Sequence, residues 1–327
     1  GWTAIGETVT AVYSPETESA EAFSRDTGVH MAVSVADLLA ESDVVDVCSP
    51  TFTHQEYVIA AANAEKPIFC EKPLARTDAD AQEMLSAAAR AGVPLGVGQV
   101  LRYFSEYAGA AETARSGELG ELAVLRFSRC SFAPANPWYR DTEKSGGVIL
   151  DLMIHDLDFA QYVAGPVTRV FGAVDTAGRD RGAARPAPHA YVILTHASGA
   201  ISHIEGSWRM PQPEFSTSFE IAGSRGLLTY NSADAAALRH RLSRLQPAPS
   251  PKTRTRRSCA RFVMRSSREH PRRSVVKRVS PHCAWRSPRS SRTVRVCPWR
   301  SRRYHDESRN RQLCPSPRGG VHRQSPQ

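Results

Sequence analysis

Two short segments of this chain combine residue types that can do chemistry. The first, at 69–74, places Lys72 directly after a run of apolar residues. The second, at 145–158, opens with glycines and places Asp151 and His155 four residues apart among mostly apolar neighbours. A lysine can stabilise a developing negative charge, and a histidine can exchange a proton near neutral pH. Both segments are therefore candidates for a catalytic site.

The position of Lys72 depends on the strand that precedes it, which we expect at 67–70. In open parallel sheets, ligands bind beyond the carboxyl ends of the strands. Pro73 restricts the backbone of the turn and so favours one direction for the lysine side chain. The alternative is a surface lysine in an ordinary loop between a strand and a helix, and this segment alone leaves both interpretations open.

The spacing of Asp151 and His155 places them on one face of a helix predicted at 148–164. A carboxylate beside an imidazole raises the pKa of the imidazole and orients its ring, as a general acid or base requires. The alternative is a buried Asp–His pair with a purely structural role.

Strands and helices alternate over the first 100 residues. We expect strands at 9–13, 44–48, 67–70 and 94–97, and helices at 16–27, 35–41, 53–64 and 78–91. Such alternation with short loops is typical of a parallel sheet with helices on both faces. The fold class expected for this part is α/β, with a Rossmann-like sheet.

The pattern changes near residue 100. Helices are expected at 105–117 and 148–164, and strands at 121–132, 167–175, 189–196, 199–209 and 216–223. This order predicts an α+β domain, in which helices pack on one face of a mostly antiparallel sheet.

The net charge of +9 is divided unevenly along the chain. Residues 1–245 contain 20 Lys and Arg against 30 Asp and Glu, whereas residues 246–327 contain 22 against 3. The segment 246–327 is rich in Arg, Ser and Pro, and we expect it to be disordered because it cannot bury enough apolar surface. One hypothesis is a basic arm for nucleic acid. We favour another, translation of a GC-rich gene in a shifted reading frame, and expect no nucleic-acid partner.

Cysteine spacing and hydropathy restrict the compartment. Cys48, Cys70 and Cys130 are far apart in apolar or strand-like segments, which indicates buried free thiols in a reducing compartment. The four cysteines beyond residue 246 lack the C-x-x-C spacing of a zinc site, so no metal is expected. No apolar run approaches the roughly 20 residues of a membrane span. We therefore expect a cytoplasmic protein with no membrane partner.

Taken together, the motifs and the domain order resemble the Gfo/Idh/MocA family, which includes glucose–fructose oxidoreductase and inositol dehydrogenase. The matching segments are 48–51 with His54, 70–74, 116–120, 138–141, 146–158 and 221–226. The resemblance implies an incomplete NAD(P)-binding domain at 1–100, an incomplete substrate and oligomerisation domain at 101–245, and a disordered tail at 246–327.

The family resemblance also implies an enzyme that transfers a hydride between NAD or NADP and a secondary alcohol or ketone of a sugar, polyol or inositol. The catalytic residues that it implies are Lys72, Asp151 and His155. His155 would take the hydroxyl proton, Asp151 would hold the hydroxyl, and Lys72 would polarise the same oxygen. The cofactor contacts that it implies are Ser14, Ser49, Pro50, Thr51, His54, Glu71, Lys72 and Gln99.

The chain departs from the family pattern in three places. The first strand and its G-x-G-x-x-G loop are absent, so we expect a truncated N-terminus and weak binding of the pyrophosphate. The strand at 9–13 is followed by Ser14 where the family usually has a ribose-binding Asp, which slightly favours NADP despite two nearby glutamates. The family's last strands and C-terminal helix are absent after about residue 237.

Two further expectations concern partners and activity. The intact family member would be a homo-oligomer, a dimer or tetramer, and would bind a small sugar or polyol. The rival hypothesis is a non-catalytic ligand-binding relative, or an inactive remnant, with the same fold. The side chains of Trp138, Tyr139, Arg140 and Trp208 could line a sugar site or belong to an ordinary core.

Overall fold

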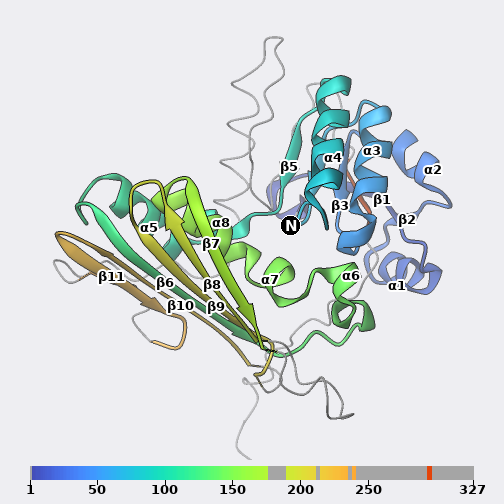
Figure 1. The fold of residues 1–327 in the computed structure, drawn as a ribbon. Helices are drawn as coiled ribbons and strands as arrows, with labels where there is room; N and C mark the ends of the chain where they lie inside the picture. Colours follow the sequence, from blue (N-terminus) through green and yellow to red (C-terminus); the bar gives the residue numbers. More distant parts are fainter. Residues whose placement is uncertain (1, 176–188, 211–213, 235–237, 241–292, 297–327) are drawn as a thin grey trace, which may run out of the picture.

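The computed structural model describes residues 2–175, 189–210, 214–234, 238–240 and 293–296. These residues form two sheets, each with helices packed against it, and the short helices α6 (Thr142–Ser145) and α7 (Gly147–Asp151) lie between the two sheets (Figure 1). The predicted α/β and α+β parts are thus confirmed. Within the described ranges, no helix combines the length and apolar character needed to cross a membrane.

The first sheet is parallel throughout, with strand order β2-β1-β13-β3-β4-β5. Its strands are β1 (Val9–Tyr13), β2 (His30–Met31), β3 (Val44–Val47), β4 (Ile68–Cys70), β5 (Leu95–Val97) and β13 (Thr293–Val296). The helices around it are α1 (Thr17–Thr27), α2 (Val35–Ala40), α3 (His54–Asn63) and α4 (Asp78–Ala91). All four residues of β3 are buried, as expected for a central strand covered on both faces.

Local chemistry sets the ends of these helices. The Ser34 hydroxyl accepts a hydrogen bond from the backbone of Asp37 at the start of α2, and Thr77 does the same for Asp80 at the start of α4. Such N-caps satisfy backbone donors that have no partner within the helix. At the other end of α4, Gly92 adopts a φ of 68°, a left-handed conformation that glycine tolerates best. Each helix therefore begins and ends close to the predicted residues.

The strand β13 differs from the expectation for the tail. We expected residues 246–327 to be disordered, yet Thr293–Val296 pairs in parallel with both β1 and β3. The physical reason is that β1 and β3 would otherwise face each other across unpaired backbone groups in the centre of the sheet. The β-branched composition of this segment suits a strand. The rest of 241–327 lies outside the described residues. The domain boundaries predicted from the sequence stay predictions.

The second sheet has seven strands in the order β12-β11-β10-β6-β9-β8-β7. Its strands are β6 (Leu122–Ser131), β7 (Val167–Val174), β8 (His189–His196), β9 (Ile201–Ser207), β10 (Phe215–Gly223), β11 (Gly226–Asn231) and β12 (Leu238–His240). Only β6 and β9 pair in parallel, so the sheet is mostly antiparallel, as predicted. The helices α5 (Ser105–Arg115), α7 (Gly147–Asp151) and α8 (Ile154–Ala164) lie on one face (Figure 1).

The single helix predicted at 148–164 is wrong in one respect, because the structure divides it into α7 and α8 at residues 152–153. The break coincides with a close approach between Met153 and strand β9. A Cβ atom on Gly206 of that strand would overlap the Met153 side chain, so only glycine allows this contact. The broken helix is therefore pressed onto the sheet between Asp151 and His155.

A buried ion pair joins α8 to the sheet. Arg129 on β6 donates two hydrogen bonds to Asp156 on α8, at 2.6 and 3.0 Å. The side chains of Arg129 and Asp156 are 5% and 0% exposed, so water screens neither charge. The bidentate geometry fixes the first turn of α8 relative to β6.

We predict that Arg129→Met lowers the free energy of unfolding by about 3–5 kcal/mol, because Asp156 would remain as a buried charge without its partner. The matched control is Arg126→Met on the same strand, since Arg126 pairs with Glu220 on the exposed face. That change should cost less than about 1 kcal/mol. Urea denaturation followed by circular dichroism measures both losses, and equal losses would contradict this account of the buried pair.

Candidate active site

Lys72 and Asp151 form an ion pair that joins the two halves of the structure. Lys72 follows β4 in the parallel sheet, and Asp151 ends α7 beside the second sheet. The Lys72 Nζ atom lies 3.1 Å from Asp151 Oδ1 and 2.7 Å from the Asp151 backbone oxygen. The two side chains are only 18% and 11% exposed. The sequence-predicted lysine and aspartate are thus brought together from positions 79 residues apart.

His155 lies in the first turn of α8, and its Nδ1 atom is buried without a hydrogen-bond partner. Burial lowers the pKa of His155 well below 6.5, and the positive charges of Lys72 and Arg129 lower it further. The expectation that Asp151 raises this pKa is wrong. The physical reason is that the Asp151 carboxylate is paired with Lys72, so a cation adjoins the site as well as an anion. A histidine of this kind is neutral at pH 7 and able to accept a proton.

The predicted cofactor contacts follow the carboxyl ends of parallel strands. They come after β1, β3, β4 and β5, and so share one edge of the sheet. Ser49 Oγ is buried there and has no hydrogen-bond partner. Ser14 is buried, and its hydroxyl accepts a hydrogen bond from the backbone of Glu16. The other residues at this edge are Pro50, Thr51, Glu71, Lys72 and Gln99.

His54 differs from the other predicted contacts, because its ring is enclosed beneath this edge. It begins α3 and is 1% exposed. Its Nδ1 atom lies 2.9 Å from the Pro73 oxygen and 3.2 Å from the Leu74 oxygen, and its Nε2 atom lies 2.8 Å from the Ser49 oxygen. Each ring nitrogen of His54 therefore faces at least one backbone carbonyl oxygen.

Aromatic rings from two segments of the chain contact one another, Phe52 from the segment before α3 and Trp138 and Tyr139 from the segment 137–140. The rings of Trp138 and Tyr139 stack with centroids 3.9 Å apart, and Phe52 meets Trp138 edge-on at 6.1 Å. Burial raises the pKa of Tyr139, and the negative charges of Asp151 and Glu71 raise it further. Trp208 is buried in the core of the second sheet, and the Arg140 side chain lies outside the described residues.

Sequence reasoning missed the arginines that pair with the acidic residues of α8. Arg129 contacts Asp156, and Arg102 donates to Asp158 at 2.6 Å. The available signal was the presence of two further aspartates after His155 in a mostly apolar helix, since buried carboxylates need partners. Nothing in the sequence indicates which arginines these are. In the described ranges, no group of three or more His, Cys, Asp or Glu side chains is placed to hold a metal ion.

Comparison with known families matches both parts of the chain. Residues 3–99 match a family model described as an oxidoreductase family with an NAD-binding Rossmann fold. Residues 107–229 match a model described as the GFO/IDH/MocA C-terminal domain. The first match contains Lys72, and the second contains Asp151 and His155.

Individual relatives agree with these matches. A myo-inositol 2-dehydrogenase of Thermotoga maritima is 38% identical over 187 residues, which are 56% of this chain and 55% of the relative. A D-apiose dehydrogenase of Paraburkholderia graminis is 31% identical over 235 residues, 68% of this chain and 60% of the relative. The chain therefore spans little more than half the length of these relatives. The crystal structure of an oxidoreductase domain protein from Kribbella flavida is similar, with a TM-score of 0.62, 28% identity and coverage of 71% and 67% of the two chains.

We predict that His155 titrates below 6.5, and that Lys72→Gln raises its pKa by removing a nearby positive charge. The unfolded chain then binds more protons than the folded one, so stability falls as the pH drops below about 6.5. Histidine-selective NMR measures the pKa, with His155→Gln assigning the signal. His155→Gln should also reduce the loss of stability at acid pH. The loss should not vanish, because burial lowers the pKa of His54 as well and this histidine still contributes. A pKa at or above 6.5 would contradict this electrostatic description.

Proposed function

The chain belongs to the Gfo/Idh/MocA family of oxidoreductases, and on this premise we propose that it transfers a hydride between a nicotinamide cofactor and a secondary alcohol or ketone of a sugar, polyol or inositol. The observation on which the proposal rests is the Lys72–Asp151 pair, 3.1 Å apart, beside a neutral His155. A non-catalytic relative would need neither the ion pair nor an unpartnered imidazole nitrogen. The ion pair and the unpartnered nitrogen therefore support the catalytic hypothesis over a non-catalytic relative.

The proposed roles follow from charge and protonation. His155 is neutral at pH 7, and its Nε2 atom is proposed to take the proton of the substrate hydroxyl, because Nδ1 is buried. The Lys72 ammonium donates a hydrogen bond to the same oxygen and stabilises the negative charge that develops there. Asp151 holds the lysine in place and accepts a hydrogen bond from the hydroxyl. When bound, the nicotinamide accepts or supplies the hydride.

The cofactor contacts are proposed at the carboxyl edge of the parallel sheet. Ser49 Oγ, buried and unpartnered, is a suitable donor for the nicotinamide end of the cofactor. Binding of the pyrophosphate is proposed to be weak, because the sequence lacks the G-x-G-x-x-G loop that usually anchors it. Ser14 in place of a carboxylate slightly favours NADP over NAD. Fluorescence titration with NADPH and NADH tests this preference, and tighter binding of NADH would refute it.

The proposed substrate class rests on the relatives and on the aromatic rings. The two relatives described above are named as dehydrogenases of myo-inositol and D-apiose, both polyhydroxylated molecules. Trp138 and Tyr139 present stacked rings, the charge of Asp151 acts on the pKa of Tyr139, and such rings pack well against the apolar faces of sugars. Cys48, Cys70 and Cys130 are free thiols, which supports a cytoplasmic location.

We predict that His155→Ala lowers kcat by about 10²–10⁴-fold, the usual effect of losing a general acid or base. Lys72→Ala should be comparably damaging and should also weaken cofactor binding, whereas His155→Ala should leave it nearly unchanged. The assay is NAD(P)-dependent oxidation of myo-inositol and related polyols, with the exposed His30→Ala as control. Oxidation should persist to a lower pH than 6.5, because the lowered pKa keeps His155 neutral there. Normal turnover in His155→Ala would refute the proposed role.

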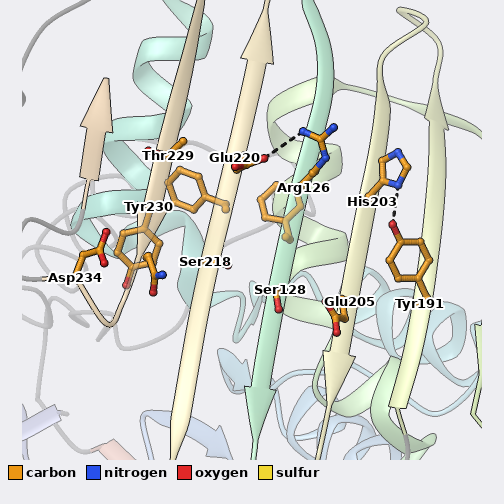
Figure 2. A pocket seen from close by; sticks show the side chains of 13 residues that line it. Arg126, Ser128, Tyr191, His203, Glu205, Ser218, Glu220, Thr229, Tyr230 and Asp234 are labelled. Carbon is orange, nitrogen blue, oxygen red and sulfur yellow. Dashed lines mark hydrogen bonds and ion pairs between the residues drawn. The ribbon is translucent and has the colours of Figure 1, made fainter. Parts of the chain in front are cut away.

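We also propose that a second copy of the chain covers the open face of the second sheet. This face has a hollow of about 400 Å³ lined by residues of β6, β8, β9, β10 and β11, and it contains none of the catalytic candidates (Figure 2). Arg126 pairs with Glu220, and Tyr191 hydrogen-bonds to His203 across this face (Figure 2). Phe171 on the edge strand is 60% exposed. A patch that combines both charges with exposed rings is self-complementary, as a two-fold interface requires.

We predict that Phe171→Glu shifts the protein toward the monomer. Phe171 pairs with Ile193 and so shares the face of Tyr191, whereas its neighbour Val170 points to the opposite face. Val170 is 63% exposed, so Val170→Glu is a control of similar exposure on the same strand. Sedimentation velocity at several concentrations measures the change. Equal behaviour of the two variants, or a monomeric parent protein, would contradict the proposed interface.

A further inference from the structure

The ring of His54 joins two loops that leave the parallel sheet at its carboxyl edge. One loop follows β3 and contributes the Ser49 oxygen, 2.8 Å from Nε2. The other is the turn after β4 that contains Lys72, and it contributes the Pro73 and Leu74 oxygens at 2.9 and 3.2 Å from Nδ1. All three partners are carbonyl acceptors.

Acceptors alone surround the ring, so its protons decide which contacts are hydrogen bonds. Burial lowers the pKa of His54, with a smaller contribution from the charge of Lys72, and the three carbonyls only partly oppose this. A neutral imidazole has one N–H group. Two carbonyl oxygens face Nδ1 and one faces Nε2, so Nδ1 is the better place for the proton. The hydrogen bond therefore runs to the turn that contains Lys72.

We infer that His54 is a positioning residue, whose Nδ1–H group holds the turn after β4 in the conformation that directs Lys72 toward Asp151. The inference rests on the proposed function of Lys72. It replaces the cofactor contact that the family resemblance implies for His54, because both nitrogens of this buried ring already face backbone carbonyls. His54 thus acts through the backbone of its neighbours.

Two further contacts bear on the position of Lys72. Its Nζ atom donates to the backbone oxygen and the carboxylate of Asp151, and its backbone nitrogen donates to the Glu71 carboxylate at 3.1 Å. Once the Pro73 and Leu74 oxygens lose their donor, the turn is free to move away from β3. The ammonium group would then leave a site in which it is 18% exposed and gain contact with solvent.

Two substitutions separate the two sides of the ring. The amide nitrogen of asparagine lies about where Nδ1 lies, and that of glutamine about where Nε2 lies. His54→Asn therefore keeps a donor for the Lys72 turn, whereas His54→Gln keeps one for Ser49. The measurement is the rate of Lys72 acetylation by acetic anhydride, followed by mass spectrometry, with the exposed Lys144 as internal reference. Thermal melting of each variant is recorded in parallel.

His54→Gln should raise the relative acetylation rate of Lys72 by about fivefold, the ratio expected from loss of one ordinary hydrogen bond. His54→Asn should stay within about twofold of the parent protein, although both variants melt earlier by similar amounts. A merely structural histidine would change both rates in step with the melting temperature. Equal rates in the two variants, or a larger increase in His54→Asn, would overturn the inference.

A third variant covers the case in which His54→Gln does not fold. His54→Ala leaves a space that free imidazole fills, and imidazole should restore the protection of Lys72 at alkaline pH. 1-Methylimidazole, which has no N–H group when neutral, should not restore it. Protection by both compounds, or by neither, would refute the donor role. None of these readouts requires turnover, so absence of hydride transfer would refute the proposed function while leaving this inference to its own test.

Discussion

The ion pair between Lys72 and Asp151 is the contact on which the arrangement of this molecule depends. Each residue belongs to a different sheet system, and the two side chains meet with little exposure to water. An ion pair of low exposure is stabilising only when its geometry is good, so both backbones must be held firmly. Different contacts hold the backbone at Lys72 and the backbone at Asp151. The pair therefore links the fold to the chemistry that we propose.

On the lysine side, the backbone is held by the sheet and by His54. The hydrogen-bond ladder continues past the strands, since Glu71 donates to Val47 and Gly98 donates to Cys70. His54 then fixes the turn that follows. On the aspartate side, Ser145 accepts a hydrogen bond from Gly147 at the start of α7. Rigid backbone on both sides means that little ordering entropy opposes the contact.

The same arrangement determines the protonation state of His155. Its pKa is lowered first by burial, and next by Lys72 and Arg129. Arg129 is held by Asp156, and Lys72 by Asp151, so two carboxylates within four residues of His155 fix the two cations near it. A neutral imidazole with an unpartnered nitrogen is the form that accepts a proton. The acidic residues of this segment thus act mainly through the basic residues that they hold.

The sequence by itself determined the two sheet types and the order of most elements, because periodicity, caps and turn residues are local properties. Motif spacing and the family resemblance also named Lys72, Asp151 and His155 as candidates. The sequence also predicted that the loops after the strands of the parallel sheet lie at one edge of that sheet. The tertiary structure alone decided which cation meets which carboxylate, since Arg129 and Asp156 lie 27 residues apart and Lys72 and Asp151 lie 79 apart. It also decided the break at Met153, which depends on Gly206 of a distant strand. The strand β13 fills a gap that only the assembled sheet defines, and the pKa of His155 follows from burial and charges that meet only in three dimensions.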